Sequence, residues 1–200
     1  MAINLANNSS LANITALPSS ISGGGMTLIS EQTASSSASI SFTSGIDSTY
    51  DSYVFKFYDI HPATNDVKLT VGFRDGSTAY DAVKTTTFFN AEHGEGGAGG
   101  SLGYGSGDDL AQSTSFQPVT KTIGNGNDES CAGTLHLFSP SSTTFVKHFY
   151  SRVNMYYSGD YTFDCFMAGY CNTTTAIDGV QFKMSSGNMD SGVIKLYGIS

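Results

Sequence analysis

Two acidic residues and a histidine lie close together where the glycine-rich segment of residues 91–109 begins. Glu92, His93 and Glu95 offer carboxylate and imidazole groups, the side chains that bind divalent metal ions in proteins. Only His93 is a good ligand for a transition metal, since the other histidines of the chain stand in separate strand or turn contexts. We therefore expect no metal site here.

A second set of possible ligands lies in the run GNGNDES. Asn125, Asn127, Asp128 and Glu129 have the oxygen atoms that calcium prefers. The run lacks the ligand spacing of an EF-hand loop, which ends in a bidentate glutamate. We expect this run to form a polar turn that binds no ion. We also expect no cofactor elsewhere in the chain.

The adjacent pair Asp108 and Asp109 raises the hypothesis of a glycoside hydrolase, which uses two carboxylates. Catalytic carboxylates must converge, but neighbours on a strand point to opposite faces and neighbours on a helix diverge. The run GYGSGDD resembles a nucleophile elbow only weakly, because a glycine loop replaces the strand-to-helix turn of that motif. We expect no catalytic residue, and therefore a protein that is not an enzyme.

The three cysteines, Cys131, Cys165 and Cys171, show no CxxC spacing and are odd in number. A zinc site or a disulfide framework is not the natural interpretation of that pattern. Free cysteine behaves as a small apolar side chain. We predict buried, reduced thiols.

The chain of 200 residues has a formal net charge of −8 and only 13% charged residues. This charge disfavours binding to a phosphate backbone, so we expect no nucleic-acid partner. Few charges among abundant Ser, Thr and Gly argue against long exposed helices. The amino terminus has no Lys or Arg before its apolar residues and no long apolar run, which predicts neither a signal peptide nor a membrane span.

Apolar residues alternate with polar ones along most of the chain after Met26, as in half-buried strands. The clearest alternations in the first half are Ile40 and Phe42, then Tyr53, Phe55 and Phe57, then Val67, Leu69, Val71 and Phe73. The second half repeats the pattern in GTLHLFS, TTFVKHFYSRVNMYY, YTFDCFMAGY, GVQFKMSSG and GVIKLYGIS, with turn residues between the runs. Together they predict about nine or ten strands in an all-β, antiparallel β-sandwich resembling a jelly roll.

Two segments stand apart from this alternation. Residues 1–25 combine scattered apolar residues with a triple glycine, which predicts an extended amino-terminal assembly arm and hinge before a sandwich domain of residues 26–200. The glycine-rich segment 91–109 predicts a long, mobile surface loop. The run DDLAQSTSFQ after it fits either a short helical turn or a strand.

Residues 192–199, at the other end of the chain, are apolar on both faces and predict an inner strand.

Five tyrosines crowd the late hairpins: Tyr150, Tyr156, Tyr157, Tyr161 and Tyr170. Exposed tyrosine makes good contacts with sugars and with protein partners, because it orders at a low entropic cost. Some of the five could equally belong to the core. The absence of tryptophan favours an ordinary subunit interface over sugar stacking.

Several longer runs carry a resemblance to a known group of proteins: SFTSGIDSTYDSYVFKFYDIHPAT, DDLAQSTSFQ, GTLHLFSPSSTTFVKHFYSR and DGVQFKMSSGNMDSGVIKLYGIS. Together they resemble a module of virion proteins from marine bacteriophages, cyanophages among them. The resemblance covers residues 26–200 and supplies no catalytic residues. It implies a virion structural protein on the particle exterior, as a tail appendage, fibre or capsid decoration, assembled in the bacterial cytoplasm.

The expected partners are other copies of the chain, as a homo-oligomer, and other virion proteins. An alternative expectation is a carbohydrate-binding module that recognises a host surface glycan. A depolymerase is a third hypothesis, which the lack of converging catalytic groups disfavours. No membrane partner is expected.

Overall fold

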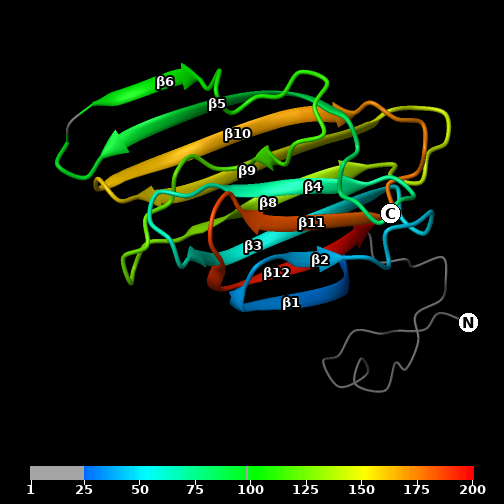
Figure 1. Cartoon of the computed structure of the whole chain (residues 1–200), viewed down its shortest axis with the longest axis horizontal. Helices are drawn as coiled ribbons and strands as arrows, with labels where there is room; N and C mark the ends of the chain where they lie inside the picture. The colour runs from blue at the N-terminus through cyan, green and yellow to red at the C-terminus, as the bar shows by residue number, and fades with distance from the viewer. Residues whose placement is uncertain (1–24, 98) are drawn as a thin grey trace, which may run out of the picture.

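The computed structural model describes residues 25–97 and 99–200, and this part of the chain forms twelve β-strands and no helix (Figure 1). The first six strands are β1 (Thr27–Ser37), β2 (Ile40–Phe42), β3 (Ser52–Pro62), β4 (Leu69–Arg74), β5 (Lys84–Gly94) and β6 (Gly100–Tyr104). The others are β7 (Gln117–Pro118), β8 (Cys131–Phe138), β9 (Lys147–Tyr157), β10 (Tyr161–Cys171), β11 (Gly179–Met184) and β12 (Met189–Ile199). Across the described ranges there is no helix with the length and apolar character needed to cross a membrane.

The strands form two sheets that pack face to face. The large sheet has the order β1-β12-β3-β8-β9-β10-β5-β6, and the small sheet has the order β2-β11-β4-β7. Every paired strand is antiparallel to its neighbour. The prediction of an all-β antiparallel sandwich is therefore confirmed, with more strands than the nine or ten expected.

The core lies between the two sheets and is centred on the phenyl ring of Phe182 in β11. The rings of Phe55 and Phe57 lie 5.2 and 5.1 Å from it, and that of Phe42 lies 6.4 Å away, all edge to face. Edge-to-face contacts are a favoured arrangement of aromatic rings. The predicted alternation of β3 is confirmed here, because Tyr53, Phe55 and Phe57 are all buried.

The glycine-rich segment 91–109 is not the long loop that was expected. β5 continues to Gly94, and β6 returns beside it, with Phe89 opposite Tyr104 and His93 opposite Gly100. Within the connecting turn, Gly97 and Gly99 have φ angles of 77° and 56°, a region that favours glycine. Ladder hydrogen bonds between the two strands offset the entropy that these glycines lose on ordering. The run DDLAQSTSFQ forms neither a helical turn nor a full strand. It consists of turns and bends with one antiparallel bridge, in which Ser113 exchanges backbone hydrogen bonds with Lys84.

The carboxyl-terminal strand β12 is an inner strand, paired with β1 on one side and β3 on the other. Its position in the sheet agrees with the prediction for residues 192–199. Its two faces are unequal, however, because Ile194 and Leu196 are fully buried and Val193 and Tyr197 are only half-buried. One face meets the small sheet and the other faces outward.

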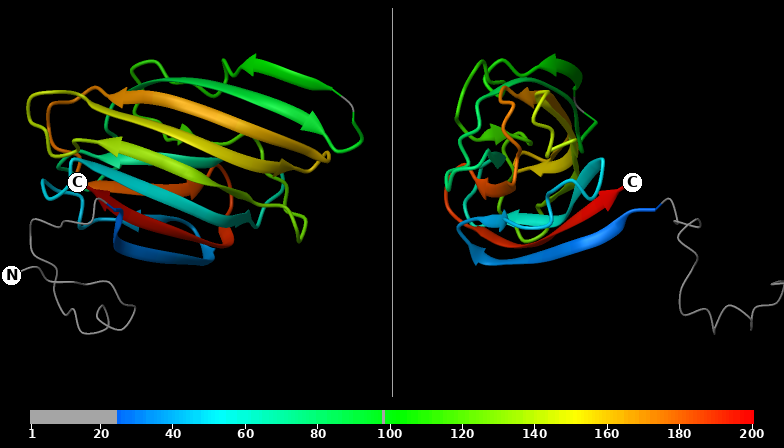
Figure 2. Two further views of the ribbon diagram at one scale, coloured as in Figure 1. Left: turned by 180° about the vertical axis from the view of Figure 1, so that it is seen from behind. Right: turned by 90° about the vertical axis from the view of Figure 1, so that its right-hand side faces the viewer.

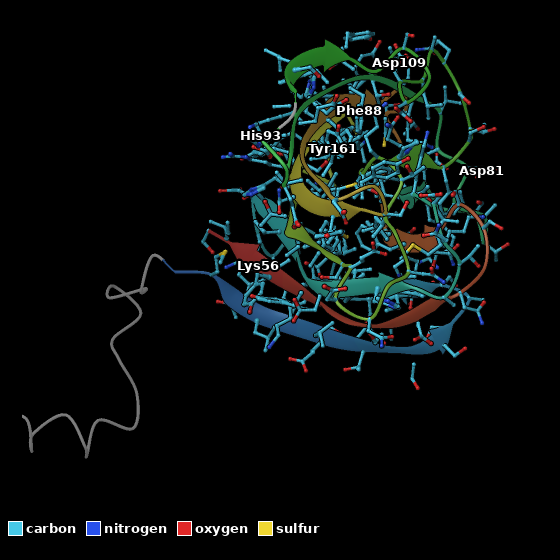
Figure 3. The ribbon with its side chains drawn as sticks, turned by 90° about the vertical axis from the view of Figure 1, so that its left-hand side faces the viewer. Lys56, Asp81, Phe88, His93, Asp109 and Tyr161 are labelled. Atoms are coloured by element: carbon cyan, nitrogen blue, oxygen red, sulfur yellow. The ribbon has the colours of Figure 1, made fainter. Side chains whose placement is uncertain are left out.

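The second face of the large sheet is covered by no other strand of the described chain. Figure 2 shows this face turned toward the viewer in its left panel and edge-on in its right panel. In the side view of Figure 3, Lys56 and His93 lie on this outer side, Phe88 lies between the layers, and Asp81 lies on the far side. We call this surface the outer face. The predicted arm, residues 1–25, falls outside the described residues except for Gly25.

Candidate functional site

Large apolar side chains are exposed on the outer face. Seven of the nine exposed large apolar residues of the described chain lie on strands of the large sheet, and none lies on a strand of the small sheet. They are Leu28, Tyr58, Phe89, Leu102, Tyr104, Phe138 and Tyr150. An apolar surface of this kind on a sheet marks a binding surface, because solvated sheet faces are normally polar.

One row of residues across the outer face is built from stacked groups. The cross-strand register places Arg152, Phe166, Phe89 and Tyr104 side by side on β9, β10, β5 and β6. The rings of Phe89 and Phe166 stack 4.7 Å apart and within 5° of parallel, and the Arg152 guanidinium lies 5.1 Å from the Phe166 centroid. Asp164 accepts hydrogen bonds from both ends of that guanidinium. The row is therefore preorganised, with its charge paired.

The lysines at the other end of the outer face also lie over aromatic rings. Lys56 Nζ is 5.3 Å from the Tyr197 centroid, and Lys195 Nζ is 5.6 Å from the Tyr58 centroid. Lys195 Nζ also lies 2.8 Å from a carboxylate oxygen of Glu31, and this hydrogen bond raises the pKa of the lysine. A cation over an aromatic ring is attracted to the negative face of that ring. The long side chains of these lysines therefore cover apolar surface of the sheet, while each ammonium group keeps a favourable contact.

A hollow lies at the end of the outer face where β8, β9 and β10 reach the β8–β9 connection. Its walls are Phe138, His148, Tyr150 and Tyr170, and its floor is Thr85, Thr87, Ala168 and Gly169, around a volume of about 400 Å³. A second hollow of about 610 Å³ shares Phe138 and His148 with the first and extends along Ser142, Thr144 and Phe145. We call the two together the aromatic groove.

The floor of the aromatic groove lies below its walls because one cross-strand row of outward-facing residues has a small residue in its middle. Ala168 lies between Tyr150 and Thr87 in the cross-strand register, so no large side chain fills that position. The next residue, Gly169, has no room for a side chain on the inner side. A Cβ atom there would stand 2.5 Å from the carbonyl oxygen of Thr85 and 2.6 Å from the Thr86 Cγ2.

Stacked rings fix the wall of the aromatic groove. His136 and Tyr150 stack with centroids 4.6 Å apart and planes 10° apart, and Phe138 lies 5.8 Å from Tyr150. Burial lowers the pKa of His136, and the nearby Lys56 charge lowers it further, so its ring is neutral near pH 7.

No Asp, Glu, Lys or Arg is among the residues that line the groove, all of which belong to the described chain.

The five tyrosines singled out in the sequence divide between the two faces. Tyr150 and Tyr170 line the aromatic groove, and Tyr156 lies in the same outward register and donates its hydroxyl to Asp160. Tyr157 packs partly against the core, with Tyr161 6.5 Å away from it. Phe138 and Phe145 also line the groove, but the sequence did not single them out. Phe138 stands at the end of a strand and Phe145 lies in a connection, so neither belongs to a clear alternating pattern.

The first set of possible metal ligands does not come together, whereas Asn127, Asp128 and Glu129 of the second set line one polar hollow. Glu92 and His93 are neighbours on β5 and point to opposite faces, and Glu95 lies in the turn beyond. In the other set, the carboxylate of Glu129 turns back on the backbone N–H of Gly126, and Asn125 donates its N–H to Asn65. Residues 25–97 and 99–200 contain no group of three or more His, Cys, Asp or Glu placed to hold a metal ion.

The two adjacent aspartates also diverge. Asp108 is only 2% exposed and accepts hydrogen bonds from Lys68 and Lys121, whereas Asp109 accepts one from the hydroxyl of Tyr104 at 2.6 Å. Burial raises the pKa of Asp108, but the hydrogen bonds from Lys121 and Lys68 outweigh burial and leave the pKa below its usual value. The pair therefore lacks the convergent geometry of a glycoside hydrolase.

The three cysteines are free and buried in the described structure, as predicted. Cys171 lies between Lys84 and Lys147 in the cross-strand register, and both lysines are fully buried. Lys84 Nζ donates to the carbonyl oxygen of Ala82 at 2.7 Å. Burial raises the pKa of Cys171 to about 12, so its thiol stays protonated and unreactive at neutral pH.

No family model matches the chain, and no curated protein matches it. A crystal structure of a protein of unknown function from Bacteroides ovatus is similar to part of the chain, with 7% sequence identity and a TM-score of 0.27. The similarity covers 50% of this chain and 44% of the other, so the chain spans less than half of that protein. A likeness at this level assigns neither a family nor a function.

Proposed function

We propose that the protein is a structural subunit on the exterior of a bacteriophage particle, in a tail appendage, a fibre or a capsid decoration, and that the outer face binds neighbouring copies or other virion proteins. The observation that carries this proposal is the concentration of exposed apolar side chains on one open sheet face. Surfaces with exposed aromatic residues and paired charges are typical of subunit interfaces.

The arrangement of side chains on the outer face favours a role in assembly over a role in catalysis. The side chains on the outer face are stacked and paired with one another, so the surface needs little reordering before it binds. Of the two aspartates that were candidates for catalysis, Asp108 is buried in ion pairs with Lys68 and Lys121, and Asp109 accepts a hydrogen bond from the Tyr104 hydroxyl. A rigid surface without converging reactive groups suits a structural subunit.

The first test compares the oligomeric state of the full chain with that of two substituted chains. Multi-angle light scattering over a range of concentrations should show the wild type as an oligomer. A chain carrying Phe89→Ser and Leu102→Ser should be mostly monomeric, because both side chains are exposed on the outer face. Phe116→Ser, at a half-buried ring over Gly72 of the small sheet, is the control on the opposite side of the sandwich and should leave the oligomer intact.

The second test concerns the particle and the arm. Antibodies to the sandwich should label intact phage particles, and a chain lacking residues 1–22 should fold but fail to incorporate into them. A wild type that stays monomeric at every concentration would overturn the binding of neighbouring copies by the outer face. Particles that carry no label would overturn the virion role.

A further inference from the structure

The aromatic groove differs in shape and chemistry from the rest of the outer face. It is a shallow, open hollow with a small-residue floor, whereas the row around Arg152 is filled by stacked side chains. Its first hollow, of about 400 Å³, lies in the size range of small-molecule sites. This end of the outer face therefore suits a ligand thinner than a neighbouring subunit.

The lining combines aromatic rings with hydroxyl groups. Phe138 and Tyr150 are 38% and 42% exposed, so parts of their rings are free to contact a ligand. Tyr150 and Tyr170 bring hydroxyls to the walls, and Thr87 adds a further hydroxyl on the floor, which also donates to the Ala168 carbonyl at 3.5 Å. A pyranose ring has a C–H face that packs on aromatic rings and a rim of hydroxyls that needs such partners.

Charge and shape narrow the class of ligand further. No carboxylate, ammonium or guanidinium lines the groove, and the His148 imidazole is the one basic side chain among its lining residues, so the groove favours an uncharged ligand over a phosphate, a uronic acid or a charged peptide. The second hollow continues from the first through Phe138 and His148, which makes the groove longer than one compact ligand requires. An uncharged, linear chain of sugars matches both properties.

We propose that the aromatic groove binds a neutral glycan, with sugar rings packed against Tyr150 and Phe138 above the floor at Ala168. The stack of His136 on Tyr150 holds this wall in place before the ligand arrives. This inference goes beyond the structural role proposed above. It is tested by a different measurement, so either can fail without the other.

The test begins with the full chain on an array of neutral oligosaccharides built from glucose, galactose, mannose and N-acetylglucosamine, with sialylated and uronic-acid glycans printed beside them. The bound neutral glycan is then titrated by calorimetry and observed by saturation-transfer NMR. Tyr150→Ala should weaken its binding about tenfold or more, which corresponds to about 1.4 kcal/mol. Ala168→Leu should abolish binding, because the added side chain fills the floor.

Two further variants separate the groove from the rest of the face. Tyr58→Ala removes an equally exposed tyrosine at the other end of the outer face and should leave the affinity unchanged. Tyr150→Phe keeps the ring and should lose less affinity than Tyr150→Ala. Thermal unfolding checks that each variant is folded. Ala168 is exposed, so we expect Ala168→Leu to fold.

Three outcomes would overturn the proposal. The first is an array on which no neutral glycan binds, or on which only charged glycans bind. The second is a neutral glycan whose affinity survives both Tyr150→Ala and Ala168→Leu, which would place its site elsewhere. The third is an oligomer that dissociates on Ala168→Leu in the absence of glycan, which would show that a second copy of the chain occupies the groove.

Discussion

Lys121 donates a hydrogen bond from its Nζ to the carboxylate of Asp108 across 2.7 Å, and that carboxylate is almost completely buried. Lys68 binds the other oxygen of the same group. Removing the negative charge with Asp108→Asn leaves two lysines without their shared partner. We expect a loss of about 3 kcal/mol in the free energy of unfolding, measured by urea denaturation. Asp109→Asn, one residue away, half-buried and bonded to the Tyr104 hydroxyl, should change it by less than about 1 kcal/mol.

The same carboxylate should make the fold sensitive to acid. The pKa of Asp108 lies below its usual value of 3.8 in the folded chain, so the unfolded chain takes up a proton first as the pH falls. Its stabilising contribution is complete above about pH 4 and is lost as the pH falls through the folded pKa. The difference in melting temperature between wild type and Asp108→Asn should therefore shrink from pH 6 to pH 2. A constant difference would contradict this assignment.

Lys84 is fully buried with one carbonyl partner, and burial lowers its pKa below the usual 10.5. The penalty for burying its charge is complete below the folded pKa and decreases as the pH rises toward 10.5. Lys84→Met should therefore stabilise the protein by about 1 kcal/mol at pH 7 and by less at pH 10. Lys56→Met on the outer face should stay within about 0.5 kcal/mol at pH 7. Chemical denaturation at the two pH values measures both effects.

All three cysteines should resist alkylation in the native protein. Burial raises the pKa of Cys165 and Cys171 to about 12, and it raises that of Cys131 as well. Iodoacetamide at pH 8 should modify none of them without denaturant and all three in urea, as counted by mass spectrometry. A disulfide between any two, or rapid labelling of the native chain, would show that a thiol is accessible.

Phe182 occupies the centre of the core, where it contacts three other phenyl rings. Phe182→Ala should cost about 3 to 5 kcal/mol, because it removes buried area and leaves a cavity between the sheets. Phe145→Ala, at a residue that is 72% exposed, is the matched control and should cost less than about 0.5 kcal/mol. Equal effects of the two substitutions would place the core elsewhere.

Alternation in the sequence predicts the strands that have one buried and one solvated face. β9 shows this clearly, because buried and exposed residues alternate from Lys147 to Met155. The run around Val71 in β4 is buried on both faces instead, since the loop residue Phe116 covers the side that faces away from the large sheet. β1 was missed because it is an edge strand rich in Ser and Thr, with Ala34 as its one buried residue. β6 was missed because glycine suggests a loop, whereas pairing with β5 orders it.

The aromatic groove could be predicted only in part. Tyr150 and Tyr170 stand out in the sequence as candidate contact residues, but they share a surface with Thr87 and Ala168 only through the pairing of three strands. Register of this kind depends on long-range pairing that no local pattern specifies. The buried Lys84 and Lys147 escape prediction for a different reason, since a lysine is normally taken to mark a solvated position.

The pairing of β1 with β12 also determines how the sandwich responds to force. Thr27, at the start of β1, lies opposite Gly198, near the end of β12. A pull between residues 27 and 198 would load these hydrogen-bonded pairs one after another and peel β1 away, instead of shearing all of them at once. Strands that peel separate at lower force than strands that shear. Tension applied at this corner would therefore release β1 first and leave the phenyl core of the sandwich closed.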